Sequence, residues 1–280
     1  MHKLFFIFIF TGTYIFANIN AVVSILPQQT FVKAIGGDKV DVSLMVQPGN
    51  SPHNYEPKPS QMIAITKADL YFTIDVEFEH VWLPKFKNSN TNLLVVDVAD
   101  GISKIHMVSA HDDHHHGHEG EDPHIWTTPA NVKIIAQNIY HALAKHDSNN
   151  TSYFKKNLDT FLASLEHTDT QIKKILSTLK GNRTFMVFHP SWGYFAKAYD
   201  LKQLAVEVEG KSPKPRELLH LIKEAKAEKV KAIFTQPEFS DASAKIIANE
   251  LKIPVIKVSP MAAKWSENLL NIANAIAGKR

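Results

Sequence analysis

Apolar residues recur at spacings of three and four between Asn150 and Lys180, and this is the longest regular pattern in the chain. Such spacing predicts an amphipathic helix, because residues three and four positions apart lie on one face. No glycine or proline interrupts the segment, so the helix would extend about 45 Å at 1.5 Å per residue. The spacing breaks between Leu165 and Ile172, which argues against a helix that forms one half of a coiled coil. We therefore predict a rigid spacer that packs against two separate lobes.

Short apolar segments alternate with helical patterns on both sides of this helix. The predicted strands are 21–26, 42–46, 70–74 and 93–96 before it, and 184–188, 204–206, 230–234 and 254–258 after it. The predicted helices are 27–36, 60–67 and one that begins at Pro129, then 191–199, 215–229, 241–251 and 263–277. This alternation is typical of βαβ units around parallel sheets. We predict an α/β fold of two lobes, each a four-stranded parallel sheet flanked by helices, joined by one long backbone helix.

Residues 1–17 have the features of a secretory signal peptide. A short basic start precedes an apolar run from Leu4 to Phe10, and Ala17 supplies a small residue at a cleavage site. The run is shorter than the roughly 20 residues of a membrane-spanning helix. The predicted organisation is a signal peptide at 1–17, an N-terminal α/β lobe at 18–148 that includes a histidine-rich loop at 106–122, a linking helix at 149–181, and a C-terminal α/β lobe at 182–280.

The chain has no cysteine, so disulfides, thiolate metal sites and a lipid-modified cysteine are excluded. A chain of 280 residues buries enough apolar surface to fold without such crosslinks. The missing lipid anchor favours the periplasm of a two-membrane bacterium. The net charge is only +3, with lysines spread along the chain, and no basic stripe or motif for nucleic-acid recognition is present. We expect a monomer that does not bind nucleic acid.

The histidine-rich loop (residues 106–122) mixes histidines with acidic residues. Neutral imidazole suits zinc and other late transition metals, whereas calcium and magnesium prefer oxygen ligands. The run is internal and interrupted by acids, so it does not resemble a purification tag. A histidine-rich tract binds metal weakly and at many sites. We predict an accessory metal-binding role for His111, His114, His115, His116 and His118.

Three further histidines, His53, His124 and His189, each stand next to a proline. His53 and His189 are predicted to occupy equivalent places, each directly after a strand, where parallel sheets form ligand sites. If the strand ends of the lobes face each other, His53 and His124 lie opposite His189. Three imidazoles leave one position of a tetrahedral metal site open. A lone histidine after a strand is more often a hydrogen-bonded loop residue, so the argument depends on the three together. The remaining histidines are expected on the surface: His80, His141, His146, His167 and His220.

Three segments closely resemble the ligand motifs of the zinc/manganese solute-binding proteins of ABC importers, the cluster A-I family: QPGNSPHNYEPKPSQ, DPHIWTTPANVKIIAQNI and FHPSWGYFAKAYDL. The likeness covers essentially the mature chain and includes VVDVADGI, VEGKSPKPRELLHLI and FTQPEFS. It implies a two-lobed fold with metal held between the lobes by the residues matching His53, His124 and His189. Zinc members of the family have histidine at the third position and manganese members usually have glutamate, so His189 favours zinc. The histidine-rich loop is also a feature of zinc members.

Two positions depart from the family pattern. The turn after the last strand, where the family often has a carboxylate ligand, contains Ser259. At the end of the preceding strand, Gln236 stands where the family motif usually has a glutamate. Serine is a poor zinc ligand. The fourth ligand is therefore left open between water, Glu238 and a loop histidine. Three nitrogens plus water also suit zinc better than manganese.

The sequence thus predicts a periplasmic receptor, not an enzyme, that captures Zn²⁺ between two lobes and delivers it to the permease of an inner-membrane ABC importer. The rigid central helix predicts only modest lobe movement. One alternative is a receptor of the same family for manganese or another divalent metal. A zinc-dependent hydrolase is less well supported, since no His-Glu-x-x-His motif supplies a general base. A surface adhesin with incidental metal is a third alternative.

Overall fold

The computed structural model describes residues 18–107, 120–181, 183–207 and 211–279. The predicted signal peptide (1–17) and the five accessory loop histidines, His111, His114, His115, His116 and His118, lie outside these ranges. Within the described ranges, no helix is long and apolar enough to cross a membrane.

The N-terminal lobe is built around a parallel sheet with the strand order β2-β1-β3-β4. Its elements are β1 (Ile19–Val23), α1 (Leu26–Gly36), the 3₁₀ turn η1 (Gly37–Lys39), β2 (Val40–Leu44), α2 (Pro59–Lys67), β3 (Leu70–Thr73), α3 (Glu77–Ser89) and β4 (Leu94–Asp97). Strand β3 is buried along its whole length, as expected for an inner strand covered on both faces. The edge strand β4 is only partly buried.

The C-terminal lobe repeats this arrangement, with the strand order β6-β5-β7-β8. Its elements are β5 (Thr184–Val187), α6 (Gly193–Ala198), β6 (Lys202–Ala205), α7 (Pro215–Ala227), β7 (Ile233–Thr235), α8 (Ala242–Leu251), β8 (Val255–Lys257) and α9 (Trp265–Ile276). In the chain, the two sheets are separated by η2 (Ile125–Thr127), α4 (Pro129–His146), η3 (Ser148–Asn150) and α5 (Thr151–Leu176). The predicted fold class is confirmed, and every strand bound lies within three residues of its prediction.

Helix α3 is not predicted from the sequence, where the expectation is that no helix lies between β3 and β4. Pro84 lies inside this helix, and a proline there removes one backbone hydrogen bond and obscures the pattern. Burial of Phe78 and Phe86 on either side of the proline stabilises the helix. Its first turn is held by the Glu79 carboxylate, which accepts hydrogen bonds from the backbone amides of residues 74–76.

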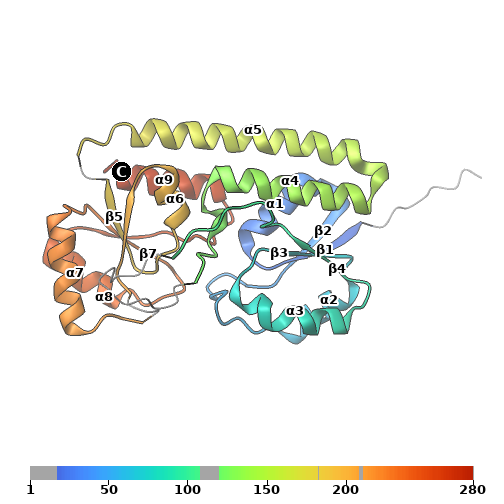
Figure 1. Ribbon diagram of the computed structural model, residues 1–280, viewed down its shortest axis with the longest axis horizontal. Helices are drawn as coiled ribbons and strands as arrows, with labels where there is room; N and C mark the ends of the chain where they lie inside the picture. The colour runs from blue at the N-terminus through green and yellow to red at the C-terminus, as the bar shows by residue number, and fades with distance from the viewer. Residues whose placement is uncertain (1–17, 108–119, 182, 208–210, 280) are drawn as a thin grey trace, which may run out of the picture.

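Helix α5 extends along one side of the molecule over both lobes (Figure 1). It ends at Leu176, four residues before the predicted end at Lys180. Where the apolar spacing breaks, Thr168 is buried and donates its hydroxyl hydrogen bond to the Ser164 carbonyl at 2.9 Å. The buried face therefore continues through a threonine that satisfies its own polar group.

The two lobes share most of their hydrophobic core. One cluster of buried side chains includes residues of both sheets and of α1, α4, α5 and α9. Three helices meet in this cluster, where the ring of Phe31 in α1 lies 5.7 Å from the ring of Phe161 in α5 and 5.6 Å from that of Trp265 in α9. A separate, smaller cluster lies between the C-terminal sheet and α7 and α8. Because densely packed interiors resist deformation, this shared core supports the expectation of modest lobe movement.

The burial of α5 gives a stability prediction. Leu165→Ala removes a fully buried side chain and should lower the free energy of unfolding by about 2–5 kcal/mol. The matched control is His167→Ala on the exposed side of the same helix, which should change it by no more than about 0.5 kcal/mol. Urea unfolding of the metal-free protein measures both. Equal effects of the two substitutions would contradict the packing of α5 on the shared core.

Candidate metal centre

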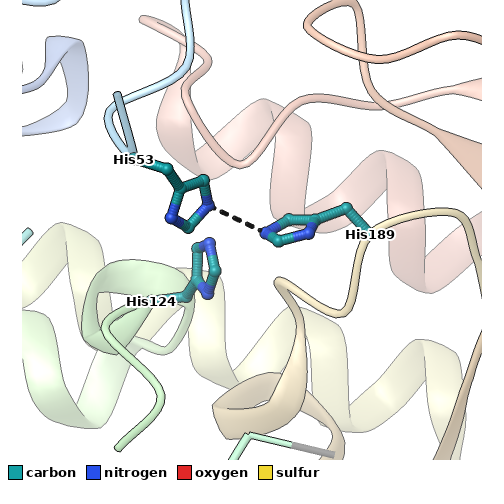
Figure 2. Close-up of side chains that lie close together, drawn as sticks. All are labelled: His53, His124 and His189. Atoms are coloured by element: carbon teal, nitrogen blue, oxygen red, sulfur yellow. Dashed lines mark hydrogen bonds between the residues drawn. The ribbon is translucent and has the colours of Figure 1, made fainter. Parts of the chain in front are cut away.

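The three histidines selected from the sequence lie together between the lobes. His53 lies in the loop after β2, His124 immediately precedes η2, and His189 follows β5. Figure 2 shows the three rings turned toward one point. Their centroids are 5.9 Å apart for His53 and His124, 4.9 Å for His53 and His189, and 5.2 Å for His124 and His189. One nitrogen from each ring lies within 4.8 Å of the other two, as a shared metal ion would require.

A carboxylate contacts the outer nitrogen, Nδ1, of each ring. The three pairs, all at 2.7 Å, are His53 with Glu77, His124 with Asp122, and His189 with Glu207. An ionised carboxylate only accepts hydrogen bonds, so Nδ1 carries the hydrogen of a neutral ring and Nε2 keeps its lone pair. Carboxylates in this position orient metal-binding histidines and raise their basicity.

The inner nitrogens are closely spaced as a result. Nε2 of His53 and Nε2 of His189 are 3.1 Å apart (dashed line, Figure 2). Two lone pairs at this distance repel each other unless a cation, either a shared proton or a metal ion, interacts with both. Two imidazole nitrogens bound to one tetrahedral zinc ion lie about 3.3–3.4 Å apart, given Zn–N bonds of 2.0–2.1 Å. The observed spacing fits such a site with little rearrangement.

The charge around the histidines also favours a cation. The second carboxylate oxygens, Glu77 Oε2, Asp122 Oδ2 and Glu207 Oε2, are buried and have no hydrogen-bond partner among the described residues. With neutral imidazoles, these three carboxylates surround the centre with negative charge, and no lysine or arginine of the described residues forms an ion pair with them. Buried charge is costly without a partner, and a divalent cation at the centre would supply one.

The pKa values of two of these histidines move in opposite directions. Burial lowers the pKa of His53, but the hydrogen bond to Glu77 and the charges of Glu77, Glu207 and Asp122 outweigh it, so this pKa is raised. Burial also lowers the pKa of His189, and the nearby His124 and His53 lower it further, so it stays below the ordinary value despite Glu207. Of these two histidines, His53 therefore binds a proton more readily than His189.

The turn that carries His124 is supported by the other lobe. Oδ1 of Asp122 accepts hydrogen bonds from both the backbone amide and Nδ1 of His124. The hydroxyl of Tyr194, in α6, donates to the backbone carbonyl of Asp122 at 2.9 Å. At Gly193 an added Cβ would lie 2.5 Å from Oδ2 of Asp122, so only glycine lets the carboxylate approach this closely. Gly193 and Tyr194, which belong to the C-terminal lobe, thus support the segment that carries His124.

Gln236 holds the backbone around His189. Its Nε2 donates to the carbonyl of His189 at 2.7 Å and to Oγ of Ser191 at 2.9 Å, while its Oε1 accepts from the amide of His189 at 3.3 Å. The ring of Phe239 stacks on the ring of His189 with 4.7 Å between centroids. The amide of Gln236 is thus fully engaged, and this residue positions His189 instead of acting as a ligand.

A small cavity at the centre is lined by the three histidines together with Ser51, Pro52, Trp126, Gln236, Glu238, Phe239, Pro260 and Met261. The hydroxyl of Ser259 donates to Oε1 of Glu238 at 3.2 Å. Burial raises the pKa of Glu238. Ser259 is therefore next to an acid of the cavity and is not itself part of the lining.

The predicted equivalence of His53 and His189 is wrong. His189 follows β5, an inner strand whose counterpart in the N-terminal sheet is β1. Ser24 follows β1, and its hydroxyl donates to Glu79. His53 comes instead from the loop after the edge strand β2. The sequence shows that a residue follows a strand, but it does not show where that strand lies in the sheet. The order of strands is established only when the chain folds.

Nothing in the sequence identifies Glu77 and Glu207 as partners of the histidines, and Asp122 is predicted only as one of the acidic residues of the loop. A carboxylate two residues before His124 was a readable signal, whereas the other two pairs join distant segments. At the base of the histidine-rich loop, the backbones of His106 and Glu121 form an isolated antiparallel bridge, so the two ends of the loop lie side by side. The histidines expected on the surface, His80, His141, His146, His167 and His220, are exposed.

Two parallel α/β lobes joined by one long helix, with converging imidazoles between them, define a two-lobed solute-binding protein with a candidate metal centre. The family model of the periplasmic zinc-uptake complex component A, ZnuA, matches residues 21–277. The chain belongs to this family, and the resemblance predicted from the sequence is confirmed.

Individual relatives are similar over most of the chain. Zinc-binding protein AdcA of Streptococcus pyogenes serotype M3 is 28% identical over 263 residues, covering 87% of this chain and 50% of AdcA, so the chain spans about half of AdcA. The high-affinity zinc uptake system protein ZnuA of Bacillus subtilis is 28% identical over 245 residues, covering 84% of this chain and 76% of that protein. A crystal structure of a ZnuA is 41% identical with a TM-score of 0.86, covering 94% of this chain and 99% of that one. A ZnuA deletion mutant with zinc bound is 42% identical with a TM-score of 0.85, covering 93% and 97%.

The opposite pKa shifts predict two separate titrations in the metal-free protein. His53 should gain its proton above the ordinary pKa of 6.5, and His189 only below it. The contribution of His53 to stability is therefore present at low pH and is lost as the pH rises through its raised pKa. The contribution of His189 is present above pH 6.5 and is lost as the pH falls through its lowered pKa. Nitrogen-15 NMR of the imidazoles measures both. Titration of His189 above His53 would contradict the charge distribution described above.

Proposed function

We propose that this chain is a periplasmic receptor that captures Zn²⁺ between its lobes and delivers it to the permease and ATPase of an inner-membrane ABC importer. The ligands are Nε2 of His53, His124 and His189. The observation that carries this proposal is the convergence of three Nε2 atoms, each with a carboxylate on the opposite nitrogen. Support also comes from the ZnuA family match and from the zinc-bound ZnuA mutant.

The donor set favours zinc over the alternative of manganese or another divalent metal. Three imidazole nitrogens suit zinc, whereas manganese prefers more oxygen ligands. The carboxylates place the ring hydrogen on Nδ1 and leave Nε2 as the donor atom, and they raise the basicity of that donor. Zinc therefore competes with a proton at His53, whose pKa is raised by Glu77. The family consists of substrate-binding transport proteins and not of enzymes, which removes support from the hydrolase alternative.

The signal peptide, the lobe boundaries and the histidine-rich loop are assigned from the sequence. Residues 1–17 direct export and are cleaved, leaving lobes at 18–148 and 182–280 joined by the helix at 149–181. The histidine-rich loop is the accessory collector of metal in this proposal, and its described ends form a backbone bridge between His106 and Glu121. The shared core limits hinge motion, so release requires the membrane partner to disturb a ligand.

The first prediction from this proposal concerns the location of tight binding. In a chelator-competition titration with Zn²⁺, the protein should keep one tight site when residues 108–119 are removed, and His189→Ala should abolish that site. His167→Ala, on the exposed side of α5, serves as the control and should bind like the unaltered protein. Loss of tight binding with the loop, and its retention in His189→Ala, would refute the interlobe site.

The second prediction concerns the outer carboxylates. Glu207→Gln keeps a hydrogen-bond acceptor for Nδ1 of His189 but removes the charge, and it should weaken zinc binding by about 10–100-fold. The matched control is Glu250→Gln, an exposed glutamate on α8. The same chelator-competition titration measures both variants. Equal affinities would show that the charge at Glu207 does not contribute to metal binding.

A further inference from the structure

One coordination position is left over at the centre, and the cavity lining offers few groups to occupy it. Three imidazole nitrogens leave one corner of a zinc tetrahedron free. Among the polar lining residues, Oγ of Ser51 accepts a hydrogen bond from the backbone amide of His53, and the amide of Gln236 is engaged around His189. Glu238 is the one acid of the described lining. Apart from the three histidines, it is the lining residue whose donor atom zinc commonly takes.

The position of Glu238 is tied to that of His189. Glu238 lies in the turn after β7, between Gln236 and the residue whose ring stacks on His189, Phe239. This turn is therefore attached to the histidine at both sides of the acid. A carboxylate so placed needs only side-chain rotation to change its distance from the centre.

Glu238 has no counter-ion among the residues that the structure describes. It is only partly exposed, and none of the ion pairs among the described residues includes it. Its hydrogen bond comes from a neutral donor, the hydroxyl of Ser259, at 3.2 Å. Ser259 itself is fixed by the backbone amide of Met261, which donates to its Oγ at 3.1 Å. The carboxylate therefore rests on a weak neutral partner beside a cluster that attracts a cation.

We propose that Glu238 is the fourth zinc ligand and that its carboxylate leaves the Ser259 hydroxyl to bind the ion when the ion enters the three-histidine cluster. The inference rests on the proposed function. The carboxylate is not among the groups whose donor atoms lie within 4.8 Å of one another, so the exchange includes a rotation of the side chain. The binding-competent centre is then three histidines and one glutamate, closed by a turn of the C-terminal lobe.

Cobalt reports this ligand directly, because the visible spectrum of Co²⁺ depends on the number and type of its ligands. Glu238→Gln should weaken Zn²⁺ binding by about 10–100-fold and change the visible spectrum of the Co²⁺ complex. Glu250→Gln, on the surface of α8, should leave both unchanged. Ser259→Ala removes the competing hydrogen bond, so its Zn²⁺ affinity should equal or exceed that of the unaltered protein. Circular dichroism of each metal-free variant verifies folding.

The outcomes separate the inference from the proposed function. An unchanged Co²⁺ spectrum in folded Glu238→Gln would overturn the inference, whether or not the affinity falls, because a charge that acts from a distance is not a ligand. Weaker Zn²⁺ binding by Ser259→Ala would overturn the exchange step. If removal of residues 108–119 changes the spectrum while Glu238→Gln does not, a loop histidine is the fourth ligand. Failure of the unaltered protein to bind Zn²⁺ tightly would refute the proposed function itself.

Discussion

The hydrogen bond between a carboxylate and Nδ1 of each histidine is the interaction on which the centre depends. It determines the tautomer of the ring, and so directs the lone pair of Nε2 inward. The three carboxylates come from different places: Glu77 from the first turn of α3, Asp122 from the segment before η2, and Glu207 from the segment that follows β6. Both lobes must therefore be folded and docked before three lone pairs converge.

Docking of the lobes is maintained by packing that continues from one into the other. The indole of Trp126 donates to the carbonyl of Pro260 at 2.8 Å, and the indole of Trp265 donates to the carbonyl of Trp126 at 2.7 Å. These bonds lie within the shared core, beside the wall of the metal cavity. A receptor with such an interface adapts to its ligand through side chains and short turns more readily than through rotation of whole lobes, since packed interiors transmit strain instead of absorbing it.

Much of the fold could be predicted because burial leaves a local pattern. Strands such as β3 are buried throughout and mostly apolar, and α5 shows the spacing of one buried face. The prediction failed where a local signal conflicted with packing. Pro84 obscured α3, although burial of Phe78 and Phe86 outweighs the lost backbone bond, and Thr168 interrupted the apolar spacing of α5 while remaining buried.

The sequence by itself determined the chemistry available to this protein: imidazole donors next to stiffening prolines, no thiolates, and alternating strands and helices that form two parallel sheets. Only the tertiary structure decided which carboxylate meets which ring, that Gln236 supports His189, and that Ser259 contacts Glu238. The physical reason is that periodicity and residue type act between neighbours in the chain, whereas strand order and lobe docking bring together segments far apart in it. His53 and His189 are 136 positions apart in sequence, yet their Nε2 atoms are 3.1 Å apart.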